Sequence, residues 1–290
     1  MSGPPAVVIT GASTGIGEAC ARRLDRIGYR VFAGVRSPEA AARLREGASE
    51  RLTPLMLDVT DAGSIARAAD TVREHVDDRG LRGLVNNAGI AVPGPLEYLP
   101  IDDLRQQLEV NVVGQVAVTQ AFLPLLRRDR GRIINMGSIS GILAAPFIGA
   151  YAASKSALEA ISDALRVELR PWGIHVVLIE PGAIATPIWE KGQSRADDLA
   201  GRLPAEAMGR YGDAIAAVRR FAREADARGL PPEAVAKVVS QAVRATRPKA
   251  RYLVGNDARL QKAVARLLPD RVRDRVLMTY LNLPGRASAG

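Results

Sequence analysis

Short apolar runs rich in β-branched residues alternate with longer helix-like segments along most of this 290-residue chain. The runs are almost continuously apolar, which is typical of parallel strands covered by helices on both faces. This alternation predicts an α/β fold with a single doubly wound, mostly parallel sheet flanked by helices. Strands are predicted at Ala6–Thr10, Arg30–Val35, Leu52–Asp58, Leu84–Asn86, Arg132–Met136, His175–Glu180 and, at the sheet edge, Arg251–Val254. Helices are predicted at Ile16–Ile27, Pro38–Glu46, Asp61–Asp77, Asp102–Arg128 and Ala150–Arg170.

Two later regions depart from this alternation, although one domain over residues 1–290 remains the prediction. Residues 187–230 stand where a short connection would suffice, and connections this long usually form lids, so we predict a substrate-binding loop. Residues 257–283 carry a helical stripe that Pro269 divides, which predicts two C-terminal helices. We expect the stripe to pack against the body or a partner subunit, and we favour this over membrane contact. It consists of Leu260, Ala263, Val264, Leu267 and Leu268, then Val272, Val276, Tyr280 and Leu283.

Cysteine and histidine are too scarce for several kinds of site. The single Cys20 allows no intrachain disulfide and no cysteine-based metal cluster, and His75 and His175 lie 100 positions apart. No uncharged run approaches the roughly 18 apolar residues of a membrane helix. The apolar start at Ala6–Thr10 is too short for a signal-peptide core. We expect a cytoplasmic protein without a metal.

The net charge of +9 comes entirely from residues 187–290, which carry 20 basic and 11 acidic residues. A basic region of this kind is found in proteins that bind nucleic acid or anionic membranes, and also on the solvated faces of ordinary helices. We favour solvated helices, and we expect no nucleic-acid binding because interleaved aromatic residues for base stacking are missing.

A glycine-rich segment follows the first predicted strand and precedes the first predicted helix. Its glycines are Gly11, Gly15 and Gly17. Glycines here allow a tight turn and a close approach of the backbone to a pyrophosphate, and the free N–H groups at the helix start attract phosphates. The arrangement predicts a Rossmann-type dinucleotide site. The spacing is G-x-x-x-G-x-G, which differs from the usual G-x-G-x-x-G.

The end of the second strand indicates which dinucleotide binds. Sites for NAD usually place an acid there to bind the ribose hydroxyls. In this chain the strand ends Gly34-Val35-Arg36, and a guanidinium is suited to pair with the 2′-phosphate of NADP. The sequence therefore predicts NADP, with NAD less favoured, and Ser13 is expected to add a hydroxyl to the same phosphate.

Three side chains form a candidate acid–base group. Tyr151 and Lys155 are four residues apart on a predicted helix, so they share a face. An ammonium beside a phenol favours the phenolate and is expected to lower the pKa of Tyr151. Ser138 follows a predicted strand, at the sheet edge where ligands bind in such folds.

Taken in order, these motifs resemble the classical short-chain dehydrogenase/reductase (SDR) family over about residues 6–186. The length, the strand end Val31–Arg36 and residues 187–230 resemble its hydroxysteroid and retinol dehydrogenase branch. The resemblance implies a catalytic set of Asn111, Ser138, Tyr151 and Lys155. It implies cofactor contacts from Gly11, Ser13, Thr14, Gly15, Ile16, Gly17, Arg36, Asp58, Val59, Asn87, Ala88, Gly89, Tyr151, Lys155, Pro181, Gly182, Ile184 and Thr186.

The implied reaction is hydride transfer between the nicotinamide and a carbonyl or a secondary or primary alcohol. Tyr151 would exchange the proton, Ser138 would bind the substrate oxygen, Lys155 would hold the nicotinamide ribose and Asn111 a relay water. The family commonly forms dimers or tetramers, so we expect a homo-oligomer. The apolar segment Ile139–Phe147 suits a hydrophobic, steroid- or retinoid-like substrate. The alternative is a non-catalytic NADP-binding regulator or scaffold with the same fold.

Overall fold

Seven parallel strands form one sheet in the computed structural model, which describes residues 3–76 and 78–283. The strand order is β3-β2-β1-β4-β5-β6-β7, so the winding reverses between β1 and β4. In such sheets ligands bind outside the carboxyl ends of the strands at this switch point. The seven predicted strands are confirmed as β1 (Ala6–Ile9), β2 (Arg30–Val35), β3 (Leu52–Met56), β4 (Gly83–Asn86), β5 (Arg132–Met136), β6 (His175–Pro181) and β7 (Arg251–Val254).

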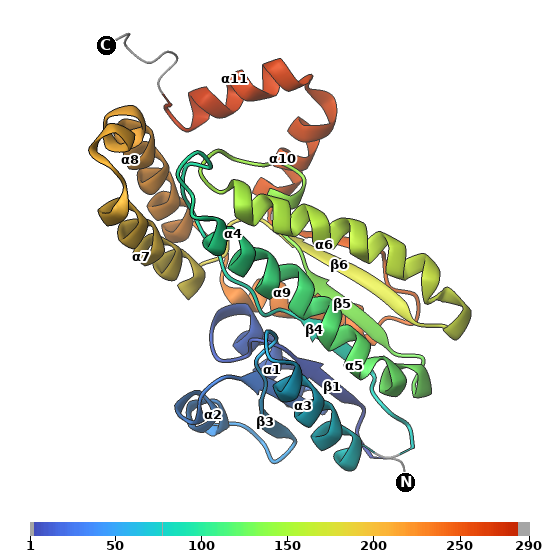
Figure 1. Cartoon of the computed structure of the whole chain (residues 1–290). Coiled ribbons are helices and arrows are strands. Elements are labelled where there is room, and N and C mark those ends of the chain that lie inside the picture. The colour runs from blue at the N-terminus through green and yellow to red at the C-terminus, as the bar shows by residue number, and fades with distance from the viewer. Residues whose placement is uncertain (1–2, 77, 284–290) are drawn as a thin grey trace.

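Helices cover both faces of the sheet, and each face has its own core (Figure 1). Because neither face meets water, neighbouring strand residues such as Val7 and Val8 are both fully buried. Cys20 is a packing residue of the first core, where burial raises the pKa of its thiol to about 12. The first face is covered by α1 (Gly15–Arg26), α2 (Pro38–Arg45) and α9 (Pro232–Arg244), and the second by α3 (Ala62–His75), α5 (Gly114–Arg128) and α6 (Gly149–Glu168).

Local capping explains where two of these helices start. The Ser37 hydroxyl accepts a hydrogen bond from Ala40 N at 3.2 Å at the start of α2. At the start of α3, the Asp61 carboxylate accepts from the N–H groups of Gly63 and Ser64. The predicted end of that helix, Asp77, lies outside the described residues, as do residues 1–2 and 284–290 of the predicted domain.

The helix predicted at Asp102–Arg128 has a break that the sequence analysis did not foresee. It consists of α4 (Ile101–Leu108), a π-helical turn at Glu109–Val113, and α5. Among the described residues, the whole run Ile101–Arg128 is the one helix that length and composition would allow to cross a membrane. Here it packs as a core helix, with Val118 and Phe122 fully buried against the sheet.

The prediction of a loop at residues 187–230 is wrong about the secondary structure of this segment. The segment forms two helices, α7 (Pro187–Arg202) and α8 (Ala205–Ala227), which lie side by side at one end of the sheet (Figure 1). Its many alanine and arginine residues favour helix, and Pro187 occupies a first-turn position where its missing N–H costs nothing.

The C-terminal region forms the two predicted helices, α10 (Asn256–Leu267) and α11 (Asp270–Tyr280), separated at Pro269. Part of their apolar stripe does not pack against the body of this chain, and packing against a partner subunit, the other half of that expectation, stays a prediction. Leu260 and Leu267 are exposed to solvent, whereas Leu281, just after α11, is buried.

Candidate active site

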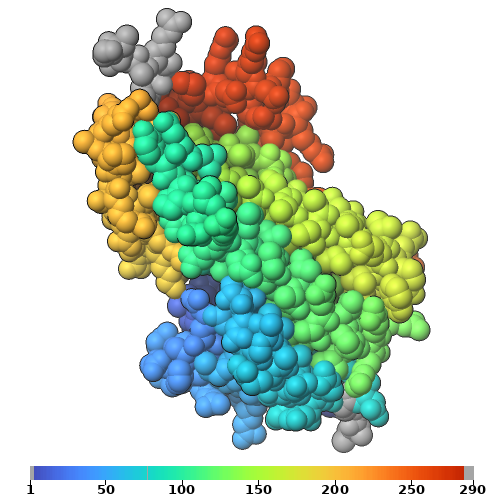
Figure 2. Space-filling view, viewed as in Figure 1, coloured from blue at the N-terminus to red at the C-terminus, as the bar shows by residue number. Residues whose placement is uncertain are grey.

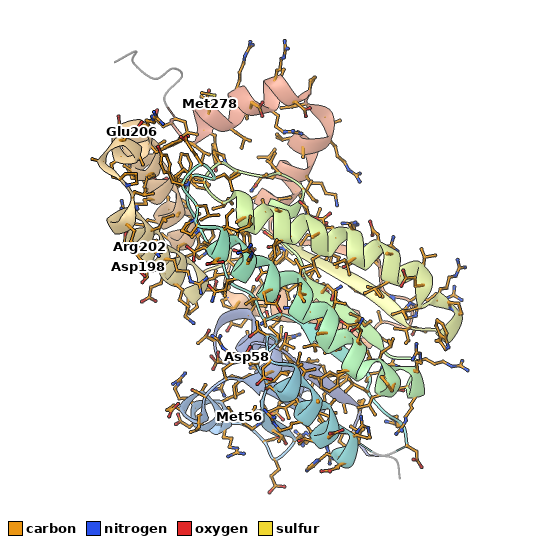
Figure 3. The ribbon with its side chains drawn as sticks, in the orientation of Figure 1. Met56, Asp58, Asp198, Arg202, Glu206 and Met278 are labelled. Atoms are coloured by element: carbon orange, nitrogen blue, oxygen red, sulfur yellow. The ribbon has the colours of Figure 1, made fainter. Side chains whose placement is uncertain are left out.

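The predicted cofactor residues gather along one edge of the sheet, in the turns after five strands. Their arrangement follows from the parallel topology, which brings the carboxyl ends of all strands to one edge. Figure 3 shows Asp58 beside Met56 at the end of β3. The turns hold Gly11, Ser13, Thr14, Gly15, Ile16 and Gly17 after β1, Arg36 after β2, Asp58 and Val59 after β3, Asn87, Ala88 and Gly89 after β4, and Pro181, Gly182, Ile184 and Thr186 after β6.

The turn after β1 is built by close backbone contacts to the turn after β4. Gly11 has a φ of +64°, and a Cβ there would come within 2.7 Å of Ala88 Cα. A Cβ on Gly17 would lie 2.5 Å from Asn87 Nδ2, which donates to the carbonyls of Thr10 and Gly11 at 3.0 Å each. Glycine is therefore required at both positions, because larger residues would separate the two turns.

The start of α1 has the features of a phosphate site. Thr14 precedes the helix, and its side chain makes no capping hydrogen bond, so the N–H groups of the first turn are not satisfied by that side chain. Free N–H groups and the positive end of the helix dipole favour phosphate oxygens. Gly15 has a φ of +61° and lies close to Thr186, whose Cβ and Cγ2 would be 3.3 Å from a Cβ at this position. These residues fit a dinucleotide pyrophosphate.

Arg36 and Asp58 lie close enough to influence each other at the ends of β2 and β3. Arg36 is exposed to solvent. Burial raises the pKa of the Asp58 carboxyl, but hydrogen bonds from Thr60 N (2.9 Å) and Thr60 Oγ1 (2.8 Å), with the Arg36 charge, lower it on balance. Asp58 is therefore an anion at neutral pH, positioned beside a guanidinium that faces solvent.

The stretch Pro181–Thr186, which the family resemblance predicts to contact the nicotinamide and which is called the nicotinamide stretch below, is shaped by two residues that were not predicted from the sequence. Asp257 Oδ2, at the start of α10, accepts a hydrogen bond from Ala183 N at 2.7 Å. A Cβ on Gly182 would collide with this carboxylate. Leu230 pairs with the stretch through backbone hydrogen bonds of 3.0 Å to Ala183 and Ala185. No motif marks either residue, because both contacts form only when the chain returns to the sheet edge.

Tyr151, Ser138 and Lys155 come together as predicted. The hydroxyl of Ser138 is hydrogen-bonded to that of Tyr151, which is half-buried on the first turn of α6. Lys155 Nζ lies 5.6 Å from the centre of the Tyr151 ring and donates to Met136 O at 2.7 Å. Ser138 caps a short 3-10 turn by accepting from Ser140 N at 3.1 Å. The phenol, the second hydroxyl and the ammonium thus meet at the carboxyl ends of β5 and β6.

The acid–base properties of this group differ from the prediction. Burial raises the pKa of the Tyr151 phenol, which the hydrogen bond with Ser138 only partly offsets. Burial also lowers the pKa of Lys155, to about 8. The expected lowering of the Tyr151 pKa is therefore not found, because burial has the largest effect on this phenol.

Asn111 sits in the π-helical turn and is fully buried. Its Oδ1 accepts from Ile90 N at 2.9 Å, and its Nδ2 donates to Ile90 O and to Ser154 Oγ, both at 3.0 Å. It thereby joins the segment after β4 to α6 at Ser154, which lies three residues after Tyr151 and directly before Lys155. A π-helical turn inside a helix often marks a functional position.

Two further buried amides hold the segment after β4, and the sequence analysis overlooked them. Gln107 donates to Ile90 O and accepts from Val92 N, both at 2.8 Å, and Gln115 Nε2 donates to Ala88 O. Gln107, Asn111 and Gln115 are spaced four residues apart along the helical run and are all buried. That spacing was a usable signal, because three polar side chains on one buried helix face need partners.

The α7–α8 pair contacts the other side of this segment. Tyr211 of α8 donates to Glu97 Oε2 at 2.6 Å, and its ring meets the edges of Tyr98 and Phe147 with centroids 6.0 Å apart in each case. Leu199 of α7 packs in a buried cluster with Val92, Leu99 and Ala150. Apolar and aromatic side chains therefore lie between the helix pair and the residues that precede Tyr151.

The chain matches a described protein family over much of its length. Residues 5–197 match the family of short chain dehydrogenases. The chain is 40% identical over 274 residues to an NADPH-dependent 3-dehydrocapnine reductase of Ornithobacterium rhinotracheale, covering 93% of this chain and 94% of the relative. It is 39% identical to human retinol dehydrogenase 5 and 38% identical to human 17-beta-hydroxysteroid dehydrogenase type 6, each over 97% of this chain and 90% of the relative.

Solved structures show the same fold. A short chain dehydrogenase from Burkholderia cenocepacia in complex with NADP superposes with a TM-score of 0.71 at 26% identity, covering 98% of this chain and all of the other. A short chain dehydrogenase/reductase from Burkholderia phymatum in complex with NAD has a TM-score of 0.76 at 24% identity over 99% and 98% of the two chains. The predicted Rossmann-type fold is thus confirmed.

Proposed function

We propose that this chain, an oxidoreductase that belongs to the short-chain dehydrogenase family, uses NADP(H) to interconvert a carbonyl and an alcohol on a hydrophobic substrate. Within that family it is similar to retinol and hydroxysteroid dehydrogenases. The observation that carries the proposal is the meeting of Ser138, Tyr151 and Lys155 next to the turn after β4, where a Cβ on Gly89 would lie 3.8 Å from Lys155 Nζ. A dinucleotide bound along the sheet edge would end next to this proton donor.

Each side chain has a distinct task in the proposed reaction. Bound NADPH supplies the hydride. Tyr151 donates its proton to the developing alkoxide in reduction, or removes it in oxidation, and Ser138 donates a hydrogen bond to the substrate oxygen. Lys155 holds the nicotinamide ribose, and its ammonium stabilises the tyrosinate left by proton donation. Asn111 keeps a relay water, and by binding both the N–H and the carbonyl of Ile90 it also fixes the backbone of the segment after β4.

Arg36 supports NADP as the cofactor. It follows β2, where sites for NAD usually carry an acid, and it is exposed beside Asp58. A guanidinium at this position pairs with the 2′-phosphate that distinguishes NADP from NAD. One relative at 40% identity is described as NADPH-dependent, and solved relatives carry NADP or NAD.

We propose a retinoid- or steroid-like substrate, admitted beneath α7 and α8 acting as a lid. Support comes from the buried cluster of Leu199, Val92 and Leu99 and from the aromatic contact of Phe147 with Tyr211. Apolar walls bind such substrates through the area they remove from water. Relatives named for retinol and 17-beta-hydroxysteroids share the full length of the fold. A cytoplasmic location and a homo-oligomeric state remain part of the proposal.

The decisive experiment follows NADPH oxidation by the purified protein with a panel of retinal, ketosteroids and short aliphatic ketones. Turnover with the bulky apolar carbonyls, and little with the short ketones, is the expected result. Tight NADPH binding without turnover on any carbonyl, and without oxidation of the matching alcohols, would instead support the non-catalytic regulator.

A further inference from the structure

One arginine joins the helix that carries Tyr151 to the strand that leads into the nicotinamide stretch. Arg251 Nη1, at the start of β7, donates to Glu159 Oε2 on α6 and to Glu180 Oε1 on β6, each at 2.9 Å. Its Nη2 donates to Asp163 Oδ2, also on α6, at 2.8 Å. A single guanidinium thus binds three carboxylates from two different elements.

The register of the sheet brings these groups to one face. Arg251 lies opposite Leu178 in the parallel pair of β6 and β7, and Glu180 follows Leu178 by two residues, so their side chains leave the same face of the sheet. Glu180 is fully buried, and Lys262 Nζ on α10 lies 3.3 Å from its Oε2. The C-terminal helices, coloured red, lie against the N-terminal end of α6 in Figures 1 and 2. Because a buried carboxylate is costly unless cations pair with it, Glu180 holds both cations at this face.

Glu159 also contacts the short 3-10 turn that begins at Ser138. It follows Lys155 by four residues on α6, and a Cβ on Gly141, the last residue of that turn, would come within 2.6 Å of Glu159 Oε1. Ser156 Oγ, on the same helix, donates to Gly141 O at 2.7 Å. The carboxylate that binds the guanidinium therefore packs directly against the turn of the second hydroxyl of the site.

We propose that Arg251 is a positioning residue for hydride transfer, an inference that rests on the proposed function. It acts through Glu159 and Glu180, and it fixes the proton donor Tyr151 on α6 relative to the nicotinamide stretch after β6. The planar fork of an arginine reaches both elements at once, whereas the ammonium of a lysine is a point charge and cannot reproduce this geometry. Such a link matters because reacting groups must be held at close to reacting distance.

Four variants of the full-length protein test the proposal. Arg251→Lys keeps the positive charge and removes the fork. Arg166→Lys is its matched control, because Arg166 also donates to Asp163, at 2.6 Å, but this pair lies within α6 alone. Glu159→Ala removes the contact on α6, and Glu159→Gln keeps an oxygen that can accept from the guanidinium.

Hydrogen exchange in the protein without cofactor measures the positioning apart from any turnover. In Arg251→Lys, exchange should be faster in the peptides that cover residues 138–141 and 181–186 than in wild type, and unchanged in those that cover β1 and β2. Arg166→Lys should exchange like wild type throughout. Exchange in Arg251→Lys that matches wild type in both regions overturns the proposal.

Single-turnover oxidation of saturating NADPH by a carbonyl measures the consequence for the chemical step. The rate should fall about tenfold to a hundredfold in Arg251→Lys and in Glu159→Ala, since a misplacement of about 1 Å can cost a hundredfold. The affinity for 2′,5′-ADP, which lacks the nicotinamide, should not change. The double variant should lose no more than either single variant, because both break one contact.

Glu159→Gln should retain more of the rate than Glu159→Ala, and this comparison decides the matter if Arg251→Lys does not fold. An equal loss of rate in Arg166→Lys, or losses in Arg251→Lys and Glu159→Ala that multiply in the double variant, contradicts positioning through this contact. Absence of wild-type turnover on any carbonyl would count against the proposed function alone, and the hydrogen-exchange comparison would then decide the role of Arg251.

Discussion

Asp257 Oδ2 accepts a hydrogen bond from Ala183 N at 2.7 Å, so the first turn of α10 sets the backbone course of the nicotinamide stretch. The contact is tight enough that Gly182, next to Ala183, has no room for a side chain. The first turn of α10 and the predicted cofactor residues are therefore linked through this carboxylate.

Asp257→Ala should weaken NADPH binding about tenfold, because a hydrogen bond to a charged acceptor is worth roughly 1.5–3 kcal/mol. Binding of 2′,5′-ADP, which lacks the nicotinamide, should not change, and Asp257→Asn should restore much of the loss by keeping an acceptor oxygen. Titration calorimetry with both ligands separates positioning from general damage. Equal weakening of the two ligands would contradict the assignment.

Tyr151→Phe should retain NADPH affinity and lose turnover by about 10²–10⁴-fold, the usual contribution of general acid catalysis. The substitution removes only the phenolic oxygen, so the fold and the α6 helix should persist. Steady-state rates and NADPH fluorescence measure the two effects on one sample. Near-normal turnover in the variant would show that another group donates the proton.

Arg36→Ala should weaken NADPH by about tenfold to a hundredfold and leave NADH almost unchanged, because only NADPH presents a 2′-phosphate to the guanidinium. The matched control is Arg45→Ala, on the neighbouring helix α2 and exposed like Arg36. Affinities for both cofactors, measured side by side, give the ratio directly. Equal or tighter NADH binding by wild type would reverse the cofactor assignment.

The pH profile of kcat/KM for NADPH should fall as pH rises through about 8, where the free protein's Lys155 loses its proton. The protonated ammonium is the form that holds the ribose hydroxyls and stabilises the tyrosinate, so activity is highest below that pH. Lys155→Arg, which stays charged, should move the falling limb to higher pH even if its rate is low. A wild-type profile that is flat through about pH 9 would exclude this role for Lys155.

Gln107→Ala should lower the free energy of unfolding by about 1–3 kcal/mol, because it leaves the buried Val92 N without its partner and removes one of the two donors to Ile90 O. Gln106→Ala, at the exposed neighbouring position, should change it by less than about 0.5 kcal/mol. Urea denaturation of both variants makes the comparison. Similar small changes in both would mean that the segment after β4 is held by other contacts.

Local patterns were enough to predict the strands, the glycine turn and the acid–base pair. One tight turn requires glycine at positions 11 and 17, because a side chain at either position would collide with neighbouring atoms. Tyr151 and Lys155 meet because a helix brings residues four apart to one face. Parallel pairing then carries the ends of five strands to one edge, so a correct list of strands already predicts where the cofactor residues gather.

Contacts between distant segments were decided only by the tertiary structure. Asp257 reaches Ala183 across 74 positions, and Tyr211 reaches Glu97 across 114, and no local spacing encodes either contact. Burial is likewise a property of the whole fold, and it raises the pKa of Tyr151, where the neighbouring lysine had suggested a decrease. For the same reason the sequence alone showed an apolar stripe on the C-terminal helices, whereas the packing of the chain determined that Leu260 and Leu267 remain in solvent.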